Sequence, residues 1–108
     1  MANPLKSLIL AGAMIACAAT AAGQAAPGAF VEAEGGKVYY ETCGSGPKAI
    51  VLIHDGVADS SVWDDVWPIL CKDFRVVRYD RRGYGRSPAA KAAYSRVDDL
   101  AAVMKAAA

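Results

Sequence analysis

Two short apolar runs, separated by one helical segment, constrain the fold more than any other feature of this sequence. Residues 49–53 read AIVLI and lack the alternation of polar and apolar residues that a half-exposed strand shows. Such a run is typical of a strand covered on both faces, as in a parallel sheet. Residues 74–79, FRVVRY, predict a second strand beyond the helical segment. Together they predict a β-α-β unit, the repeating element of α/β domains.

A hairpin is expected before this unit and a helix after it. Residues 30–34 and 37–43 read as two strands, and Gly35 and Gly36 between them favour a tight turn. Residues 44–47, GSGP, form a turn cluster. Ser95 begins a final helical pattern, with Asp98 completing an approximate capping box. Its core-facing side is predicted to be Val97, Leu100, Ala101, Met104 and Ala108.

The helical segment between the two buried strands reads SVWDDVWPILCKDF. Ser61 is the expected cap of its first turn. Because a proline does not fit deep inside a regular helix, we predict an irregular turn up to Trp67 and a new start with Pro68 in its first turn. The two tryptophans, Trp63 and Trp67, are predicted to be core rather than pocket lining. The apolar residues at helical spacing are Val62, Val66, Ile69 and Leu70.

The N-terminus predicts export. Lys6 is the sole charged side chain before Glu32, and an apolar run over residues 8–22 is followed by small residues, which is the layout of a secretory signal peptide. We expect residues 1–25 to be the signal peptide and residues 26–108 the exported part, in the periplasm or secreted. A membrane-spanning anchor is the weaker alternative, because alanine and glycine dominate the run.

The net charge of the exported part excludes two classes of binding partner, and its cysteines indicate the compartment. Removing the signal takes one lysine from twelve basic side chains and none of the eleven acidic ones, which leaves eleven of each. Such a balance gives no strong field for nucleic acid or acidic membranes, so neither is an expected partner. A lipid anchor at Cys17 is a poor alternative, since Met14 stands where leucine is usual. The exported part keeps two cysteines, Cys43 and Cys71, and we expect it to reach an oxidising compartment.

A motif follows each buried strand. The first strand runs into His54, Asp55 and Gly56, and the second into residues 80–87, DRRGYGRS, with Trp63 between them. This order resembles the N-terminal third of the α/β-hydrolase family, over roughly residues 30–108. Members usually carry His-Gly after the third strand and Asp-x-Arg-Gly-x-Gly-x-Ser after the fourth. The resemblance implies an incomplete α/β-hydrolase fold, in which an antiparallel hairpin precedes β-α-β-α of a mostly parallel sheet.

The resemblance also assigns roles to the first loop. It places the backbone N–H of Gly56 in the oxyanion hole, as one of two donors that stabilise the tetrahedral intermediate. His54 and Asp55 would shape this loop. Asp55 departs from the family, which usually has glycine there, although aspartate tolerates unusual backbone angles better than most residues. Direct proton transfer by His54 is not expected, because the family's general base lies near the far C-terminus.

The nucleophile of the family lies in G-x-S-x-G, and no serine of the exported part stands in that context. These serines are Ser45, Ser60, Ser61, Ser87 and Ser95. We therefore expect an N-terminal fragment of an exported hydrolase acting on an ester-like or related bond of a small molecule, truncated before the nucleophile and inactive alone. No metal and no cofactor is implied. The alternatives are a non-catalytic binding module of the same fold and a small secreted binding protein.

Two further expectations concern single features. The arginines and glycines of DRRGYGRSP could suggest a nucleic-acid or dinucleotide site, but the third glycine is absent and Pro88 stands where a helix should open. A tight structural loop is the better interpretation. The family's second strand lies beside the fourth and runs antiparallel to it, which would bring Cys43 and Cys71 to the same end of the sheet. A disulfide or two buried thiols both remain open.

Overall fold

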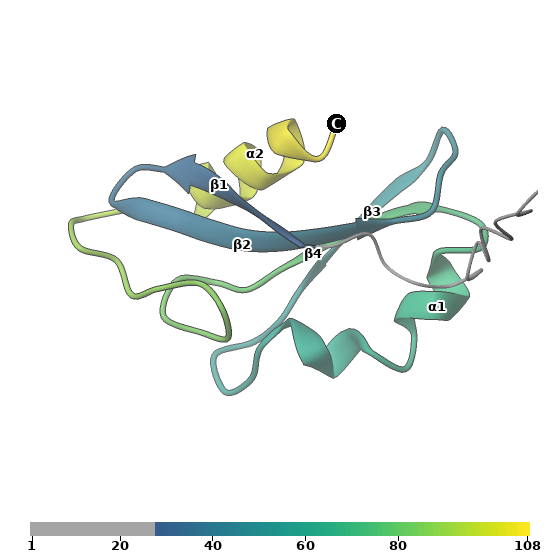
Figure 1. Ribbon diagram of the computed structural model, residues 1–108, viewed down its shortest axis with the longest axis horizontal. Coiled ribbons are helices and arrows are strands. Elements are labelled where there is room, and N and C mark those ends of the chain that lie inside the picture. The colour runs from purple at the N-terminus through teal and green to yellow at the C-terminus, as the bar shows by residue number, and fades with distance from the viewer. Residues whose placement is uncertain (1–27) are drawn as a thin grey trace, which may run out of the picture.

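A computed structural model describes residues 28–108, which form a four-stranded sheet with helices on both faces (Figure 1). The expected signal peptide and Cys17 lie outside these residues. No helix within residues 28–108 is long and apolar enough to span a membrane. The strands are β1 (Ala29–Ala33), β2 (Gly36–Cys43), β3 (Ala49–Ile53) and β4 (Arg75–Tyr79). The helices are the 3₁₀ helix η1 (Ser60–Trp63), α1 (Trp67–Leu70) and α2 (Arg96–Ala106).

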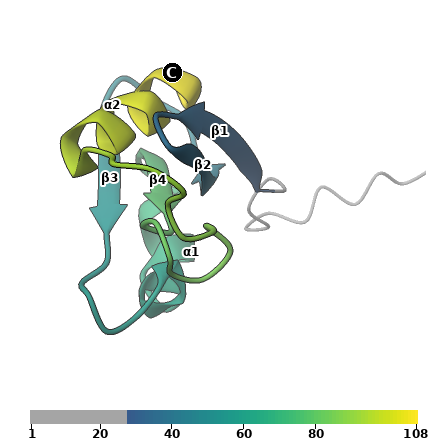
Figure 2. The ribbon, with the colours of Figure 1, turned by 90° about the vertical axis from the view of Figure 1, so that its left-hand side faces the viewer.

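The strand order is β1-β2-β4-β3, and the chain directions follow the expected pattern (Figure 2). β1 and β2 form an antiparallel hairpin, β2 pairs antiparallel with β4, and β3 pairs parallel with β4. The parallel β3/β4 pair is joined through η1 and α1, which is the predicted β-α-β unit. The α/β class is confirmed, with a small mixed sheet and few helices, as an incomplete α/β-hydrolase fold requires.

β4 supplies both halves of the core because successive strand residues point to opposite faces. Val77 and Tyr79 pack with Val38 and Val103 on the α2 side. Val76 packs on the opposite side. Its buried partners there are Leu52 and Trp67, with Trp63 packed against the cluster. Trp67 is only 5% exposed, so the prediction that the tryptophans are core is confirmed.

The first helical turn begins differently from the prediction. Asp59, not Ser61, is the cap: its carboxylate accepts the N–H of Ser61 at 2.8 Å. The reason is a long-range bond, because the N–H of Ser60 is already held by the carboxylate of Asp80 at 2.8 Å. That contact fixes the start of η1 two residues earlier than predicted. Hydrogen bonding to Ser61 also lowers the pKa of Asp59.

Of the four apolar residues at helical spacing, Leu70 packs against the buried cluster, whereas the other three lie on the outward side of η1 and α1. Ile69 is 60% exposed, and Val62 and Val66 are also exposed. Trp67 is the first residue of α1 and turns its indole onto the sheet, so residues on the opposite side of this short helix face away. Pro68 does lie in the first turn, as predicted.

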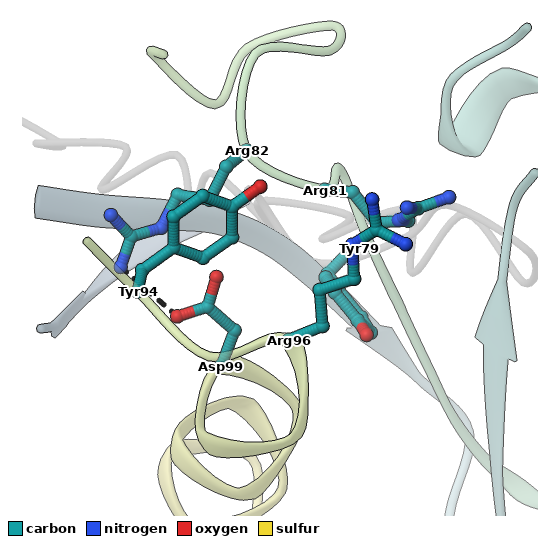
Figure 3. Close-up of a pocket in the computed structure, with 6 residues that line it drawn as sticks. All are labelled: Tyr79, Arg81, Arg82, Tyr94, Arg96 and Asp99. Atoms are coloured by element: carbon teal, nitrogen blue, oxygen red, sulfur yellow. Dashed lines mark hydrogen bonds and ion pairs between the residues drawn. The ribbon is translucent and has the colours of Figure 1, made fainter. Parts of the chain in front are cut away.

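The predicted core face of α2 is confirmed at Leu100, which packs against the Val38 cluster, and is wrong at its other residues. Val97 is 72% exposed and Met104 is 51% exposed, whereas Asp99 and Val103 are buried. The rotation follows from an ion pair that hydropathy does not reveal: Arg82 Nη2 lies 3.0 Å from Asp99 Oδ1, with both side chains buried (Figure 3). The cap is as predicted, since Ser95 accepts the N–H of Asp98 at 3.2 Å.

Arg82 connects α2 to the hairpin as well. Its Nη2 also donates to the carbonyl of Glu34 at 2.6 Å, and the ring of Tyr94 lies 5.1 Å from its guanidinium carbon. The guanidinium therefore joins the loop after β4, the turn of the β1/β2 hairpin and the first turn of α2. Breaking one partner of such a buried pair leaves an uncompensated charge, which is costly.

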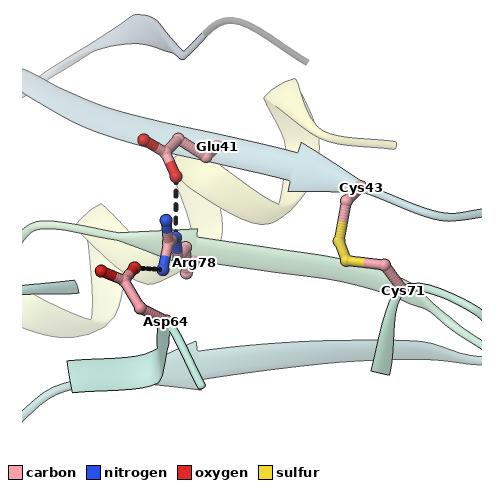
Figure 4. The surroundings of a disulfide bond; sticks show 5 residues. All are labelled: Glu41, Cys43, Asp64, Cys71 and Arg78. Atoms are coloured by element: carbon pink, nitrogen blue, oxygen red, sulfur yellow. Dashed lines mark hydrogen bonds and ion pairs between the residues drawn. A yellow bond between two sulfur atoms is a disulfide. The ribbon is translucent and has the colours of Figure 1, made fainter. Parts of the chain in front are cut away.

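The opposite end of the sheet is closed by a disulfide between Cys43 and Cys71, with their Cα atoms 5.4 Å apart (Figure 4). It joins the last residue of β2 to the C-cap of α1.

Nearby, Arg78 of β4 donates to Glu41 at 2.7 Å and to Asp64 at 2.6 Å. Burial opposes the charge of Arg78, but the hydrogen bonds to Asp64 and Glu41 outweigh it and raise its pKa.

The disulfide predicts that the purified oxidised protein has no free thiol at Cys43 or Cys71. Closing a loop of 28 residues stabilises a domain by about 3.6 kcal/mol in the chain-entropy model. Chemical unfolding with and without reductant measures the difference, and alkylation followed by mass spectrometry counts the thiols. Two alkylated cysteines in the non-reduced protein would refute the pairing.

Gly44, which follows β2, is predicted to be intolerant of any side chain. It has φ of +71°, and a Cβ there would overlap the carbonyl oxygens of Phe74 and Cys71. Gly44→Ala should lower the free energy of unfolding by about 3 kcal/mol. The matched control is Gly46→Ala, where φ is +119° but the nearest atom is 3.8 Å from the added Cβ; it should cost about 1 kcal/mol. Equal losses in urea unfolding would contradict this account.

Candidate functional site

The loop of residues 54–59 leaves the C-terminal end of β3 and is held by the loop that follows β4. His54 begins it and is only 3% exposed. His54 Nε2 lies 2.9 Å from the backbone nitrogen of Arg81, and Nδ1 lies 2.6 Å from the carbonyl oxygen of Asp55. A backbone N–H is a donor and a carbonyl an acceptor, so the proton resides on Nδ1 and Nε2 accepts. Both ring nitrogens of His54 are thus engaged in structural hydrogen bonds.

Asp80 holds the other end of the same loop. Its buried carboxylate accepts the N–H of Ser60 through Oδ1 at 2.8 Å and the N–H of Arg86 through Oδ2 at 2.9 Å. Its own N–H donates to the carbonyl of Tyr39 in β2 at 3.0 Å. One ionisable side chain therefore joins the loop after β3 to the loop after β4. The DRRGYGRS motif contains Asp80 but does not by itself predict this anchoring function.

Within the loop, Asp55 organises the backbone around Gly56. Its Oδ1 accepts the N–H of Val57 at 3.1 Å, which is an Asx-type turn. No non-glycine residue from 28 to 108 has a positive φ, so Asp55 occupies an ordinary conformation. Asp55, where the family usually has glycine, therefore introduces no backbone strain. The tolerance of aspartate for unusual backbone angles is not needed at this position.

Gly56 is exposed, and its N–H donates to no acceptor among residues 28–108. The neighbouring N–H of Val57 is different, because Asp55 occupies it. The structure thus brings His54, Asp55 and Gly56 together at the end of β3, with a free donor at Gly56. Its φ is not positive.

The loop after β4 is shaped by two glycines in the left-handed region. Gly83 has φ of +80° and Gly85 has φ of +49°. A Cβ at Gly85 would overlap the carboxylate of Asp80, so only glycine fits against this anchor. Ser87 closes the loop: its buried Oγ accepts the N–H of Tyr39 at 2.8 Å and donates to the carbonyl of Asp80. The tight loop predicted from DRRGYGRSP is confirmed.

The side chains described here provide no acid–base pair for nucleophilic catalysis. Ser87 is buried with its hydroxyl engaged, and His54 has both nitrogens occupied. Within residues 28–108, no group of three or more His, Cys, Asp or Glu side chains has metal-binding geometry. The chemical capacity of the site is therefore hydrogen-bond donation from a fixed backbone.

A polar pocket of about 230 Å³ is lined by Asp80 together with residues of β2, η1, β4 and the loop after β4. Arg78 and Arg86 face Glu41, Asp59 and Asp64 there, so positive and negative groups are mixed. Arg86 also donates to the hydroxyl of Tyr39, whose pKa is raised by burial and by its hydrogen bond to Glu41. The cations are already paired, so this network stabilises the β2/β4 pair and the start of η1.

The anchoring role of Asp80 predicts a local effect of Asp80→Asn. An amide has one acceptor oxygen instead of two, so either Ser60 or Arg86 loses its buried acceptor. The loss should be about 2 kcal/mol of unfolding free energy, with faster hydrogen exchange at one of these two amides. Asp73→Asn, an exposed aspartate without such bonds, is the control. Equal stability of the two variants would rule out this role.

Comparison with known proteins places these loops in a family. The family model described as "Alpha/beta hydrolase family" matches residues 50–108. A "Probable oxidoreductase EphD" of Mycobacterium tuberculosis is 48% identical over 73 residues, covering 62% of this chain and 12% of that protein. A "Karrikin insensitive 2 receptor IA" of Petunia hybrida is 50% identical over 42 residues, 39% of this chain and 15% of the receptor.

Among solved structures, a thermophilic esterase from Thermogutta terrifontis superposes with a TM-score of 0.62 at 27% identity. The match covers 75% of this chain and 32% of the esterase. The chain therefore spans a third or less of the length of each of these proteins. Because the family model covers more than half of the chain and includes both motif loops, the chain belongs to the α/β hydrolase family.

Proposed function

We propose that residues 54–57 are the oxyanion-hole loop of a hydrolase that acts on an ester-like or related bond of a small molecule. The single observation that carries this proposal is the backbone N–H of Gly56, which is exposed and has no acceptor among the described residues. Its loop is held at both ends, through His54 and Asp80. A fixed, unoccupied donor is what stabilisation of a developing oxyanion requires.

Preorganisation is the physical reason to favour such a site over a flexible turn. A donor aimed in advance costs no reorganisation when negative charge develops on the substrate oxygen. Here the orientation of Gly56 depends on the Asp55 carbonyl bonded to His54 and on the Val57 N–H bonded to Asp55. The peptide group that carries the Gly56 N–H is thus held through its Asp55 carbonyl, and the following peptide group is held through the Val57 N–H, while the Gly56 N–H itself stays free.

The similar proteins support the reaction class only broadly. One is named as an esterase, one as a probable oxidoreductase and one as a receptor. A fold hosts several chemistries because the reacting groups differ among its members. We propose that the nucleophile, its acid and its base come from outside residues 28–108, since Ser87 and His54 are fully engaged. No cofactor is proposed.

We also propose that the protein is exported to the periplasm or secreted after removal of a signal peptide over residues 1–25. Two features support this. The N-terminal sequence has the charge and apolar pattern of such a signal. The Cys43–Cys71 disulfide is of a kind that persists in oxidising compartments.

A non-catalytic binding module is the second candidate. The 50% identity to a karrikin receptor over 42 residues favours it, since that relative is named as a receptor. In this case Gly56 would bind a ligand oxygen without turnover. A downstream nucleophile elbow, G-x-S-x-G or G-x-D-x-G, in the coding sequence would favour the enzyme, and its absence would favour the binder.

The proposal predicts that the 108-residue chain alone does not hydrolyse p-nitrophenyl acetate, whereas a chimera does. In the chimera, residues 28–108 replace the matching part of the Thermogutta esterase. Gly56→Pro removes the N–H and should reduce kcat of the chimera about 100-fold. Gly56→Ala keeps the N–H, and its Cβ would meet only the Tyr84 hydroxyl at an ordinary 3.6 Å, so most activity should remain.

Thermal unfolding of each chimera confirms that the compared variants are folded. Equal kcat for the parent and Gly56→Pro chimeras would show that the Gly56 N–H is not an oxyanion donor. Turnover by the 108-residue chain itself, above a heat-inactivated control, would show that it contains its own nucleophile.

A further inference from the structure

Tyr84 is a feature that neither the motif nor the oxyanion-hole proposal uses. It lies between Gly83 and Gly85, both with positive φ, so the backbone on each side is in a conformation that favours glycine. The N–H of Tyr84 donates to the carbonyl of Arg81 at 2.9 Å, and its carbonyl accepts the N–H of Ser87 at 3.0 Å. The direction of this side chain is therefore set by a rigid turn.

That turn aims Tyr84 at the loop after β3. Its ring lies against His54, with 5.3 Å between ring centroids and an edge-to-face angle of 67°. A Cβ built on Gly56 would lie 3.6 Å from the Tyr84 hydroxyl oxygen. The hydroxyl is thus beside the glycine whose N–H is free.

The hydroxyl is not explained by packing. The edge-to-face contact with His54 needs only the ring, which phenylalanine would supply equally. Among residues 28–108 the Tyr84 hydroxyl makes no hydrogen bond, and the side chain is partly exposed. Two unoccupied donors, one from each loop, consequently lie next to each other.

One cation lies near the two donors. The Arg81 guanidinium carbon lies 5.6 Å from the Tyr84 ring centroid, and Arg81 Nη1 donates to the carbonyl of His54 at 3.5 Å. The cation is therefore held at the edge of the same loop pair. The nearest carboxylate in sequence, Asp55, is bonded to the N–H of Val57.

We propose that Tyr84 is a second binding residue of this site, and that its O–H donates to the oxygen, or to an adjacent oxygen of the same group, that the Gly56 N–H binds. The ligand class is a small oxyanion, such as the carboxylate of a product or a tetrahedral acyl intermediate. This inference rests on the proposed function of Gly56. It adds a side-chain donor from the β4 loop to a site formed by the β3 loop.

The test is a titration of the ¹⁵N-labelled 108-residue chain with methylphosphonate, a tetrahedral anion, at constant ionic strength. The amide signal of Gly56 reports binding, and the Arg81 amide, bonded to His54, reports the integrity of the loop pair. Tyr84→Phe removes only the hydroxyl and should raise Kd about tenfold, as expected for one hydrogen bond to a charged group. Tyr94→Phe, which lies over Arg82 instead, should leave Kd unchanged.

The outcomes separate the two proposals. Saturable movement of the Gly56 signal, weakened by Tyr84→Phe with the Arg81 amide unmoved, supports both. Equal Kd for the wild type and Tyr84→Phe overturns the role of Tyr84 and leaves Gly56 as a donor. A Gly56 signal that does not respond in the wild type overturns the oxyanion site itself and Tyr84 with it. If Tyr84→Phe does not fold, Tyr84→His, which keeps a ring donor, must bind more tightly than Tyr84→Leu.

Discussion

The site depends on one buried carboxylate. Asp80 accepts a backbone N–H from each of two loops that are 26 residues apart, Ser60 after β3 and Arg86 after β4. Charge-assisted bonds of this kind are stronger than neutral ones, and burial makes their loss costly. The parallel pairing of β3 and β4 ends both strands at the same edge of the sheet, so one side chain is enough to hold both loops.

His54 is the second link between the loops, and it joins them through two hydrogen bonds of an uncharged ring. Its Nε2 accepts from Arg81 while its Nδ1 proton satisfies the carbonyl of Asp55. His54, which the sequence suggests as a catalytic residue, is therefore a neutral histidine that joins the two loops through hydrogen bonds. What it leaves available is the N–H of Gly56, and the chemistry proposed for the loop is hydrogen-bond donation, not proton transfer.

Local patterns predicted the sheet well and the helix orientations poorly. β3 coincides with the apolar run 49–53, but the prediction that both its faces are covered is wrong for residues 28–108, because β3 is an edge strand and Leu52 is its one buried residue. The face of α2 was wrong because Asp99, a polar residue, is buried by its bond to Arg82 seventeen positions away. The roles of Asp80 and Tyr84 were not predicted for the same reason: each contacts a residue far away in the sequence, Ser60 for Asp80 and His54 for Tyr84. The glycines flanking Tyr84 were the available signal, since they mark a turn with a defined direction.

The central claim, that the β4 loop holds the Gly56 N–H ready for an oxyanion, is tested most directly by a crystal structure of the protein with methylphosphonate. The account predicts a phosphonate oxygen about 2.7–3.1 Å from the Gly56 nitrogen, with the Asp80 and His54 bonds intact. A well-ordered structure in which the Gly56 N–H is bonded within the protein, or in which the phosphonate binds elsewhere and leaves this loop unoccupied, would contradict it.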